Sequence, residues 1–159
     1  MLKMSRLTDY GTGVLAYLAG AGQTPHSTSE VAEQTGLPPA TVGKVLKLLT
    51  RAGLVVSQRG AQGGYRLARP PQAISAAEVI GALEGPLALT ECAQATGSCD
   101  FEASCLVGGA WQRINIAIRR ALSDITLAEL ASLEAGKLPA FDLKTLAASP
   151  GTIARLSRD

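Results

Sequence analysis

Residues 27–53 read STSEVAEQTGLPPATVGKVLKLLTRAG, and residues 54–68 continue as LVVSQRGAQGGYRLA. The capping box Ser27-Thr-Ser-Glu30 predicts the start of a short helix that ends at Gly36, because its serine and glutamate satisfy free backbone N–H groups. The two prolines that follow suit the first turn of a longer helix, which we expect to end at Gly53. Two helices joined by a glycine turn are typical of a helix-turn-helix motif.

The longer of these helices has two different faces. Its apolar residues fall on one stripe, which we expect to point inward: Val42, Val45, Leu46 and Leu49. Its polar residues fall on another face and are the candidate DNA contacts: Thr41, Lys44, Lys47 and Arg51. Gly43 lies in mid-helix on this side, where glycine costs about 1 kcal/mol relative to alanine. The sequence offers no reason for it beyond close approach to DNA.

The segment after Gly53 predicts two short strands, Leu54–Gln58 and Tyr65–Ala68, joined by a glycine-rich turn. Such a hairpin is the wing of a winged helix-turn-helix. Arg59, beside three glycines, has no obvious packing role and suits the narrow, electronegative minor groove of DNA. The alternative is that these cations form a solvated face on a three-helix core.

Charge is distributed unevenly along the chain. Residues up to Pro70 include eight Lys or Arg and three acids, whereas the remainder has seven basic and ten acidic residues. A basic first part beside an acidic second part indicates that only the first part meets a polyanion. No segment approaches the roughly 18 apolar residues that a membrane span needs, so we expect no membrane partner.

A long helix is predicted from about Cys105 to Leu122. Its apolar residues alternate at spacings of four and three: Val107, Trp111, Ile114, Ile118, Ala121 and Ile125. Such a seam requires a partner helix, so we expect a homodimer with Trp111, Ile114 and Ile118 in the interface. The predicted fold is therefore mainly α with a small β-hairpin wing: a winged helix-turn-helix followed by a long dimerisation helix.

Four parts are expected along the chain. A DNA-binding domain over 1–84 precedes a cysteine loop over 85–105, a dimerisation helix with a short helix over 106–132, and a C-terminal tail over 133–159. No nucleophile motif, phosphate loop or paired carboxylate site appears, and there is one histidine, so we expect neither catalytic residues nor a small-molecule substrate. That histidine, His26, is expected to be an ordinary surface residue in a turn.

Three cysteines stand close together as Cys92-x6-Cys99-x5-Cys105. An odd number in one short segment does not fit a disulfide-stapled secreted domain and favours a reducing cytoplasm. The spacing is wider than the knuckles usual for structural zinc. Three soft thiolates on a loop favour an iron–sulfur cluster, with zinc and unligated thiols as the alternatives.

The sequence resembles the Rrf-type transcriptional regulators, over roughly Met1 to Leu130. The matching features are Ser5-Arg-Leu-Thr-Asp-Tyr10, Arg59-Gly-Ala-Gln-Gly-Gly-Tyr65, the clustered cysteines and Ile125-Thr-Leu-Ala-Glu-Leu130. The family includes iron–sulfur assembly regulators and nitric-oxide-sensing repressors. The opening helix and cysteine loop are most similar to regulators of the SUF iron–sulfur assembly operon.

The resemblance implies a dimer in which the cluster lies near the DNA-binding domain of the other subunit. One branch of the family holds a two-iron cluster with three cysteines and a histidine three residues after the last cysteine. Gly108 stands at that position here, which counts against this ligation and leaves a two-iron cluster as the less favoured alternative. Another branch completes a four-iron cluster with an aspartate in the opening helix of the other subunit, which Asp9 matches. Asp9 could equally serve the helix dipole, and acids of the cysteine loop (Glu91, Asp100 and Glu102) could substitute for it.

These observations predict a cytoplasmic, homodimeric repressor that binds double-stranded operator DNA and senses iron–sulfur cluster status or redox stress. We expect it to control genes for cluster assembly. A nitric-oxide-sensing repressor of the same family is one alternative. A thiol- or zinc-dependent winged-helix regulator without a cluster is the other.

Overall fold

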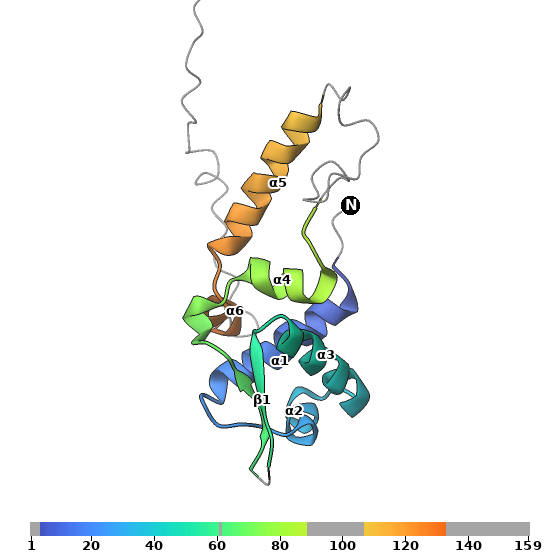
Figure 1. The fold of residues 1–159 in the computed structure, drawn as a ribbon, viewed down its shortest axis with the longest axis vertical. Helices are drawn as coiled ribbons and strands as arrows, with labels where there is room; N and C mark the ends of the chain where they lie inside the picture. Colours follow the sequence, from blue (N-terminus) through green and yellow to red (C-terminus); the bar gives the residue numbers. More distant parts are fainter. Residues whose placement is uncertain (1–3, 61, 89–106, 133–159) are drawn as a thin grey trace, which may run out of the picture.

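The computed structural model describes residues 4–60, 62–88 and 107–132. Its elements in chain order are α1 (Arg6–Gly20), α2 (Thr28–Thr35), α3 (Pro39–Arg51), β1 (Val55–Gln58), β2 (Gly64–Leu67), a 3-10 turn (Pro71–Ala73), α4 (Ala76–Glu84), α5 (Gly108–Ser123) and α6 (Leu127–Ser132). Figure 1 shows α1–α4, α6 and the hairpin gathered into one body, from which α5 projects. The predicted mainly helical fold with a two-stranded wing is confirmed.

Capping boxes begin three of these helices, as their sequences predict. At the start of α2, Ser27 Oγ accepts from the Glu30 N–H at 3.2 Å, and the Glu30 carboxylate accepts from the Ser27 N–H at 2.6 Å. The same exchange begins α4 at Ser75 and α6 at Thr126. Each pair satisfies backbone donors that a helix start otherwise leaves free.

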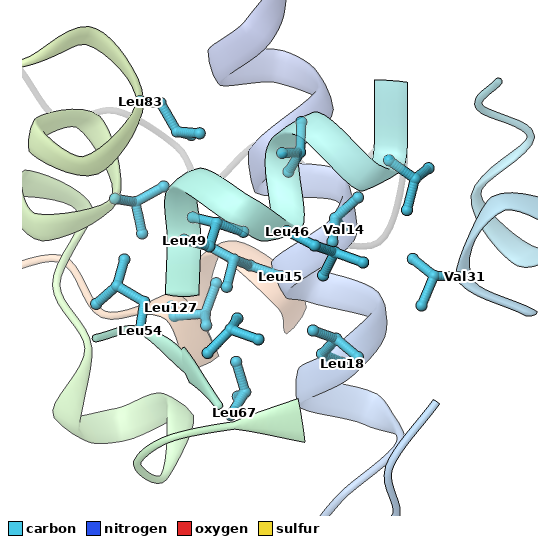
Figure 2. Packing of buried hydrophobic residues seen from close by; sticks show 14 of the residues in the cluster. Val14, Leu15, Leu18, Val31, Leu46, Leu49, Leu54, Leu67, Leu83 and Leu127 are labelled. Atoms are coloured by element: carbon cyan, nitrogen blue, oxygen red, sulfur yellow. The ribbon is translucent and has the colours of Figure 1, made fainter. Parts of the chain in front are cut away.

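The core lies between α1 and α3, and Figure 2 shows their leucines and valines interlocking. The predicted inward stripe of α3 is confirmed, because all four of its residues are completely buried: Val42, Val45, Leu46 and Leu49. On α1 the buried apolar residues are Val14, Leu15 and Leu18. Burying a side chain of this size is worth about 1.5–3 kcal/mol, so this contact holds α3 firmly on the body.

The wing is an antiparallel hairpin with Val55 opposite Leu67 and Gln58 opposite Gly64. A third segment pairs with β2. The His26 N–H donates to the Tyr65 carbonyl at 2.9 Å, and the Tyr65 N–H donates to the His26 carbonyl at 2.8 Å. The hairpin is therefore tied along β2 to the turn between α1 and α2.

Packing explains two of the wing glycines. A Cβ on Gly64 would lie 2.6 Å from the His26 backbone, and one on Gly63 would lie 2.8 Å from the Gly60 carbonyl oxygen. Both distances are too short for any side chain, because the neighbours are backbone atoms that cannot turn away. These two glycines thus report the close approach of chain segments and give no information about DNA.

The last described helix returns the chain to the body. Leu127 at the start of α6 is completely buried in the core, its N–H donates to the Ile74 carbonyl at 2.7 Å, and α6 packs against α1. On the other side, α4 crosses α1 closely, because a Cβ on Gly11 would overlap the Leu83 side chain. Helix α1 is therefore held between α3, α4 and α6.

Helix α5 contacts α4, and most of its side chains are exposed, although Asn115 is buried. The predicted helix from Cys105 to Leu122 is confirmed in outline; its first two residues lie outside the described ranges. Among the helices that the structure describes, none combines the length and apolarity needed to cross a bilayer.

Candidate nucleic-acid interface and cofactor segment

The cations predicted on α3 are exposed. Lys44, Lys47 and Arg51 lie on the solvent side of the helix, opposite its buried stripe, and Thr41 is half-buried near the helix start. Within the described ranges no carboxylate pairs with these three cations. Their charges are therefore available to an external anion, and a helix with a cationic outer face matches the width of the DNA major groove.

Arg59 is exposed where β1 runs into the wing turn. Two other arginines of the hairpin region have structural partners. Arg66 donates to the Gln23 side-chain oxygen at 2.9 Å, which holds β2 to the turn after α1. Arg69 forms a salt bridge of 2.7 Å with Glu78 and also donates to the Ala73 carbonyl. Arg59 therefore differs from Arg66 and Arg69, which stabilise the fold through contacts with other segments.

Figure 1 shows α2 and the hairpin at one end of the body, α3 beside α1, and α5 projecting at the opposite end. A polar groove runs between the hairpin and the start of α2, lined by Gln23, Thr24, Pro25, Ser27, Glu30, Gln58, Gln62 and Gly63. Backbone and side-chain hydrogen bonds from Ser27 lower the pKa of Glu30 in this groove. The groove thus offers amide and hydroxyl groups but carries one fixed negative charge, and its polar residues were not among the candidates read from sequence.

His26 differs from the sequence expectation of an ordinary surface residue. It is half-buried, its Nδ1 lies 3.1 Å from the Tyr17 hydroxyl oxygen, and the two rings meet edge-on with centroids 5.3 Å apart. Its backbone also carries the bridge to Tyr65. The residue therefore joins α1 to the wing, a role that depends on segments far apart in the chain.

Asp9 is exposed in the first turn of α1, and within the described ranges its carboxylate makes no hydrogen bond or ion pair. The capping work at this helix start is done by other residues. Ser5 Oγ accepts from the Leu7 N–H at 3.2 Å, and Glu84, at the end of α4, accepts from the Ser5 N–H at 2.8 Å and the Ser5 hydroxyl at 2.6 Å. The buried Thr8 hydroxyl donates to the same oxygen of Glu84.

Side-chain hydrogen bonds from Ser5 and Thr8, together with the Ser5 backbone N–H, lower the pKa of Glu84. An anion at a helix start also meets the positive end of the helix dipole. Sequence reasoning missed this contact, because no local pattern announces a carboxylate that arrives from 79 residues away. It ties the start of α1 to the point where the chain leaves α4 toward the cysteines.

The three cysteines (Cys92, Cys99 and Cys105) lie outside the described residues, as do the alternative acidic ligands Glu91, Asp100 and Glu102. In the described ranges no three His, Cys, Asp or Glu side chains come together as a metal site. Of the predicted ligands the structure therefore places Asp9 alone. Gly108, which stands where one family branch has a histidine, begins α5.

Two of the three predicted interface residues of α5 are exposed, and the third is partly buried. Trp111 is 40% exposed, Ile114 is 44% exposed and Ile118 is half-buried. Val107 and Ile125, at the two ends of the same seam, are also exposed. The helix thus presents a continuous apolar strip that the described part of the chain does not cover.

Comparisons with known proteins agree with this architecture. A family model described as "Rrf2: Iron-dependent Transcriptional regulator" matches residues 4–133. Protein rrf2 of Nitratidesulfovibrio vulgaris is 33% identical over 130 residues, which cover 81% of this chain and 87% of that protein. The HTH-type transcriptional regulator IscR of Vibrio cholerae is 33% identical over 129 residues, which cover 79% of this chain and 74% of that protein.

A solved structure of CymR, the global cysteine regulator of B. subtilis, superposes with a TM-score of 0.64 at 33% identity. The match covers 84% of this chain and 99% of that structure. The match to the family model extends over most of the chain and includes both the winged helix-turn-helix and α5. The chain therefore belongs to the Rrf2 family and is a DNA-binding transcriptional regulator, not an enzyme.

Proposed function

We propose that this protein is a cytoplasmic, homodimeric repressor whose operator binding responds to an iron–sulfur cluster, and that it controls genes for cluster assembly. The observation that carries the proposal is the cysteine trio of residues 92–105, combined with an exposed Asp9 on a helix that is capped by Ser5, which Glu84 in turn holds. The family description, an iron-dependent transcriptional regulator, supports it.

The donor set fits a cluster. Three thiolates supply the soft ligands that iron in such clusters prefers, and a carboxylate can complete the fourth position. Cys92, Cys99 and Cys105 would hold the cluster together with Asp9 of the opposite subunit. Because Ser5 and Glu84 satisfy the start of α1, capping does not require the Asp9 carboxylate. The Asp9 carboxylate is therefore available as a ligand, and as the fourth ligand it would suit the four-iron cluster that the family resemblance implies.

DNA contact is assigned to the exposed face of α3 and to the wing. Lys44, Lys47 and Arg51 suit phosphate contacts, Thr41 suits a base edge, and Arg59 suits the minor groove. In a dimer joined through α5, the two copies of α3 would meet half-sites about 34 Å apart, so their spacing must be fixed. The end of α4 is anchored to α1 through Glu84, and the first cysteine, Cys92, follows eight residues later in the chain.

The described contacts suggest a route for the signal. Cluster occupancy would act at the end of α4 and the start of α1, and α1 packs directly against α3. A coupling free energy of about 1–3 kcal/mol would change operator affinity by about 5- to 150-fold. Oxidation, nitric oxide or iron scarcity would each remove the cluster and release this coupling.

A cluster-free regulator is the second candidate. The similarity to CymR, the global cysteine regulator of B. subtilis, favours it. The same DNA-binding body would then respond through thiols or zinc. Metal analysis separates the candidates, because zinc is colourless whereas an iron–sulfur cluster absorbs visible light.

The test is to measure iron and acid-labile sulfide per chain, with the visible spectrum, on full-length protein purified without oxygen. We expect iron and sulfide in near-equal amounts, lost in Cys92→Ser, Cys99→Ser and Cys105→Ser and diminished in Asp9→Ala. Glu33→Ala, which removes an exposed acid from α2, is the matched control and should retain the cluster. Zinc alone, or no metal after reconstitution, would overturn the cluster proposal and leave the winged-helix regulator standing.

A further inference from the structure

Most glycines of the DNA-binding body have a structural reason. Gly11, Gly63 and Gly64 are required by packing, because a Cβ at each would overlap a neighbouring segment. Others, such as Gly36, adopt a positive φ that side chains rarely tolerate. Four helical glycines have neither reason: Gly13, Gly20, Gly43 and Gly81. Of these four, Gly43 is the one that lies on α3, the helix that carries Lys44 and Lys47.

The fold leaves room for a side chain at position 43. A Cβ there would lie 4.0 Å from the Thr28 methyl group, an ordinary van der Waals distance, and Gly43 does not have a positive φ. Glycine in a helix interior costs about 1 kcal/mol relative to alanine. The folded chain therefore carries a cost at this position that nothing in its own packing demands.

The location of Gly43 suggests why glycine stands at this position. Gly43 is half-buried at the edge of the cationic face, next to the exposed Lys44 and one turn before the exposed Lys47. Thr28, at the start of α2, borders it on the other side. Gly43 therefore lies where α3 approaches the start of α2, on the surface proposed to meet DNA.

We propose that Gly43 is a DNA-contact position, at which the absence of a side chain lets the α3 backbone approach the base edges or sugar-phosphate chain closely. It would set how deeply α3 enters the major groove and so determine operator specificity. The inference rests on the proposed DNA-binding surface. It predicts in addition that a methyl group on Gly43 raises the stability of the protein and lowers its affinity for the operator.

The test compares Gly43→Ala with Gly81→Ala in the full-length protein. Gly81 is an exposed glycine inside α4 with no atom within 4 Å of a built Cβ, so it offers the same gain in helix propensity away from α3. Both variants should resist thermal unfolding slightly better than the wild type, because alanine narrows the unfolded ensemble. The probes are a duplex selected on the wild-type protein from a random-sequence pool and a scrambled duplex of equal length.

We expect Gly43→Ala to lose about tenfold in affinity for the selected duplex, the scale of one disrupted base-pair contact. Its affinity for the scrambled duplex should change little, since non-specific binding rests on phosphate contacts. Gly81→Ala should bind both duplexes as the wild type does. Unchanged affinity of Gly43→Ala for the selected duplex, or a loss of its thermal stability, would overturn the inference.

Lys47→Ala, measured beside these variants, separates this inference from the proposed surface. A shallower salt dependence in Lys47→Ala together with unchanged binding by Gly43→Ala would reject the role of Gly43 alone. An unchanged salt dependence in Lys47→Ala would instead count against Lys47 as a phosphate contact of the proposed surface, whatever Gly43→Ala shows.

Discussion

Helices α1 and α5 have nearly equal lengths, 15 and 16 residues, but opposite surroundings. Helix α1 is enclosed by α2, α3, α4 and α6 and buries Val14, Leu15 and Leu18. Helix α5 buries Asn115 alone among its own residues and leaves Trp111 exposed. Both sequences are amphipathic, so the difference lies in where the partner of the apolar face comes from. For α1 it comes from the same chain, and for α5 we expect it from a second copy.

The largest expected effect tests the enclosed region. Leu46→Ala removes a completely buried side chain between α3 and α1. We expect a loss of about 2–5 kcal/mol in the free energy of unfolding, because the deletion leaves a cavity in a close-packed core. Urea denaturation followed by circular dichroism measures it. Ile116→Ala, which truncates a 63% exposed side chain of α5, should change the same quantity by less than about 0.5 kcal/mol.

The second effect tests the uncovered region. Trp111→Ala should weaken the dimer about 30-fold, equivalent to about 2 kcal/mol, because a buried tryptophan is a common anchor of interfaces. Sedimentation equilibrium over a range of concentrations measures the dissociation constant, with Ile116→Ala as the control because Ile116 lies off the predicted seam. A dimer of wild-type strength in the Trp111 variant would mean that α5 does not form the interface through this strip.

A third measurement separates exposed groups that serve the fold from those that serve DNA. Lys47→Ala should leave the free energy of unfolding unchanged within about 0.5 kcal/mol. It should make the dependence of log affinity on log salt shallower by about 0.9 unit, the value for one phosphate contact. Binding titrations at several salt concentrations provide the slope. An unaltered slope would remove Lys47 from the DNA-contact surface.

The smallest effect concerns the junction at which the chain leaves the body. The pKa of Glu84 is lowered by hydrogen bonds from Ser5 and Thr8, so its contribution to stability is present above the ordinary glutamate pKa. That contribution disappears as the pH falls through the lowered folded value. In Glu84→Gln, we expect a weaker decline of the free energy of unfolding on acidification. The control is Glu33→Gln. Identical pH profiles for the Glu84 variant and the wild type would mean that the contacts of Glu84 with Ser5 and Thr8 do not contribute to stability.

Short-range patterns were sufficient to predict much of the fold and the outer face of α3. The capping residues of α2, α4 and α6 lie three positions apart, so their hydrogen bonds could be expected from the chain itself. The stripe of α3 follows from helical periodicity, and its burial leaves Lys44 and Lys47 outside. The cysteine cluster, the dimer and the DNA contacts remain predictions, since the cysteines lie outside the described ranges and the other two need a partner.

Contacts between distant segments were decided by the tertiary structure. Glu84 binds Ser5, the N-cap residue of a helix that begins 78 positions before Glu84. Leu127 completes a core built by residues before position 84, and His26 pairs with β2. No local pattern encodes such meetings, because each depends on how whole elements pack. The role of a glycine likewise depends on tertiary structure, since the sequence alone does not distinguish Gly64 from Gly43. Only the packed structure shows that the first is required by a neighbouring backbone and that the second has room for a side chain.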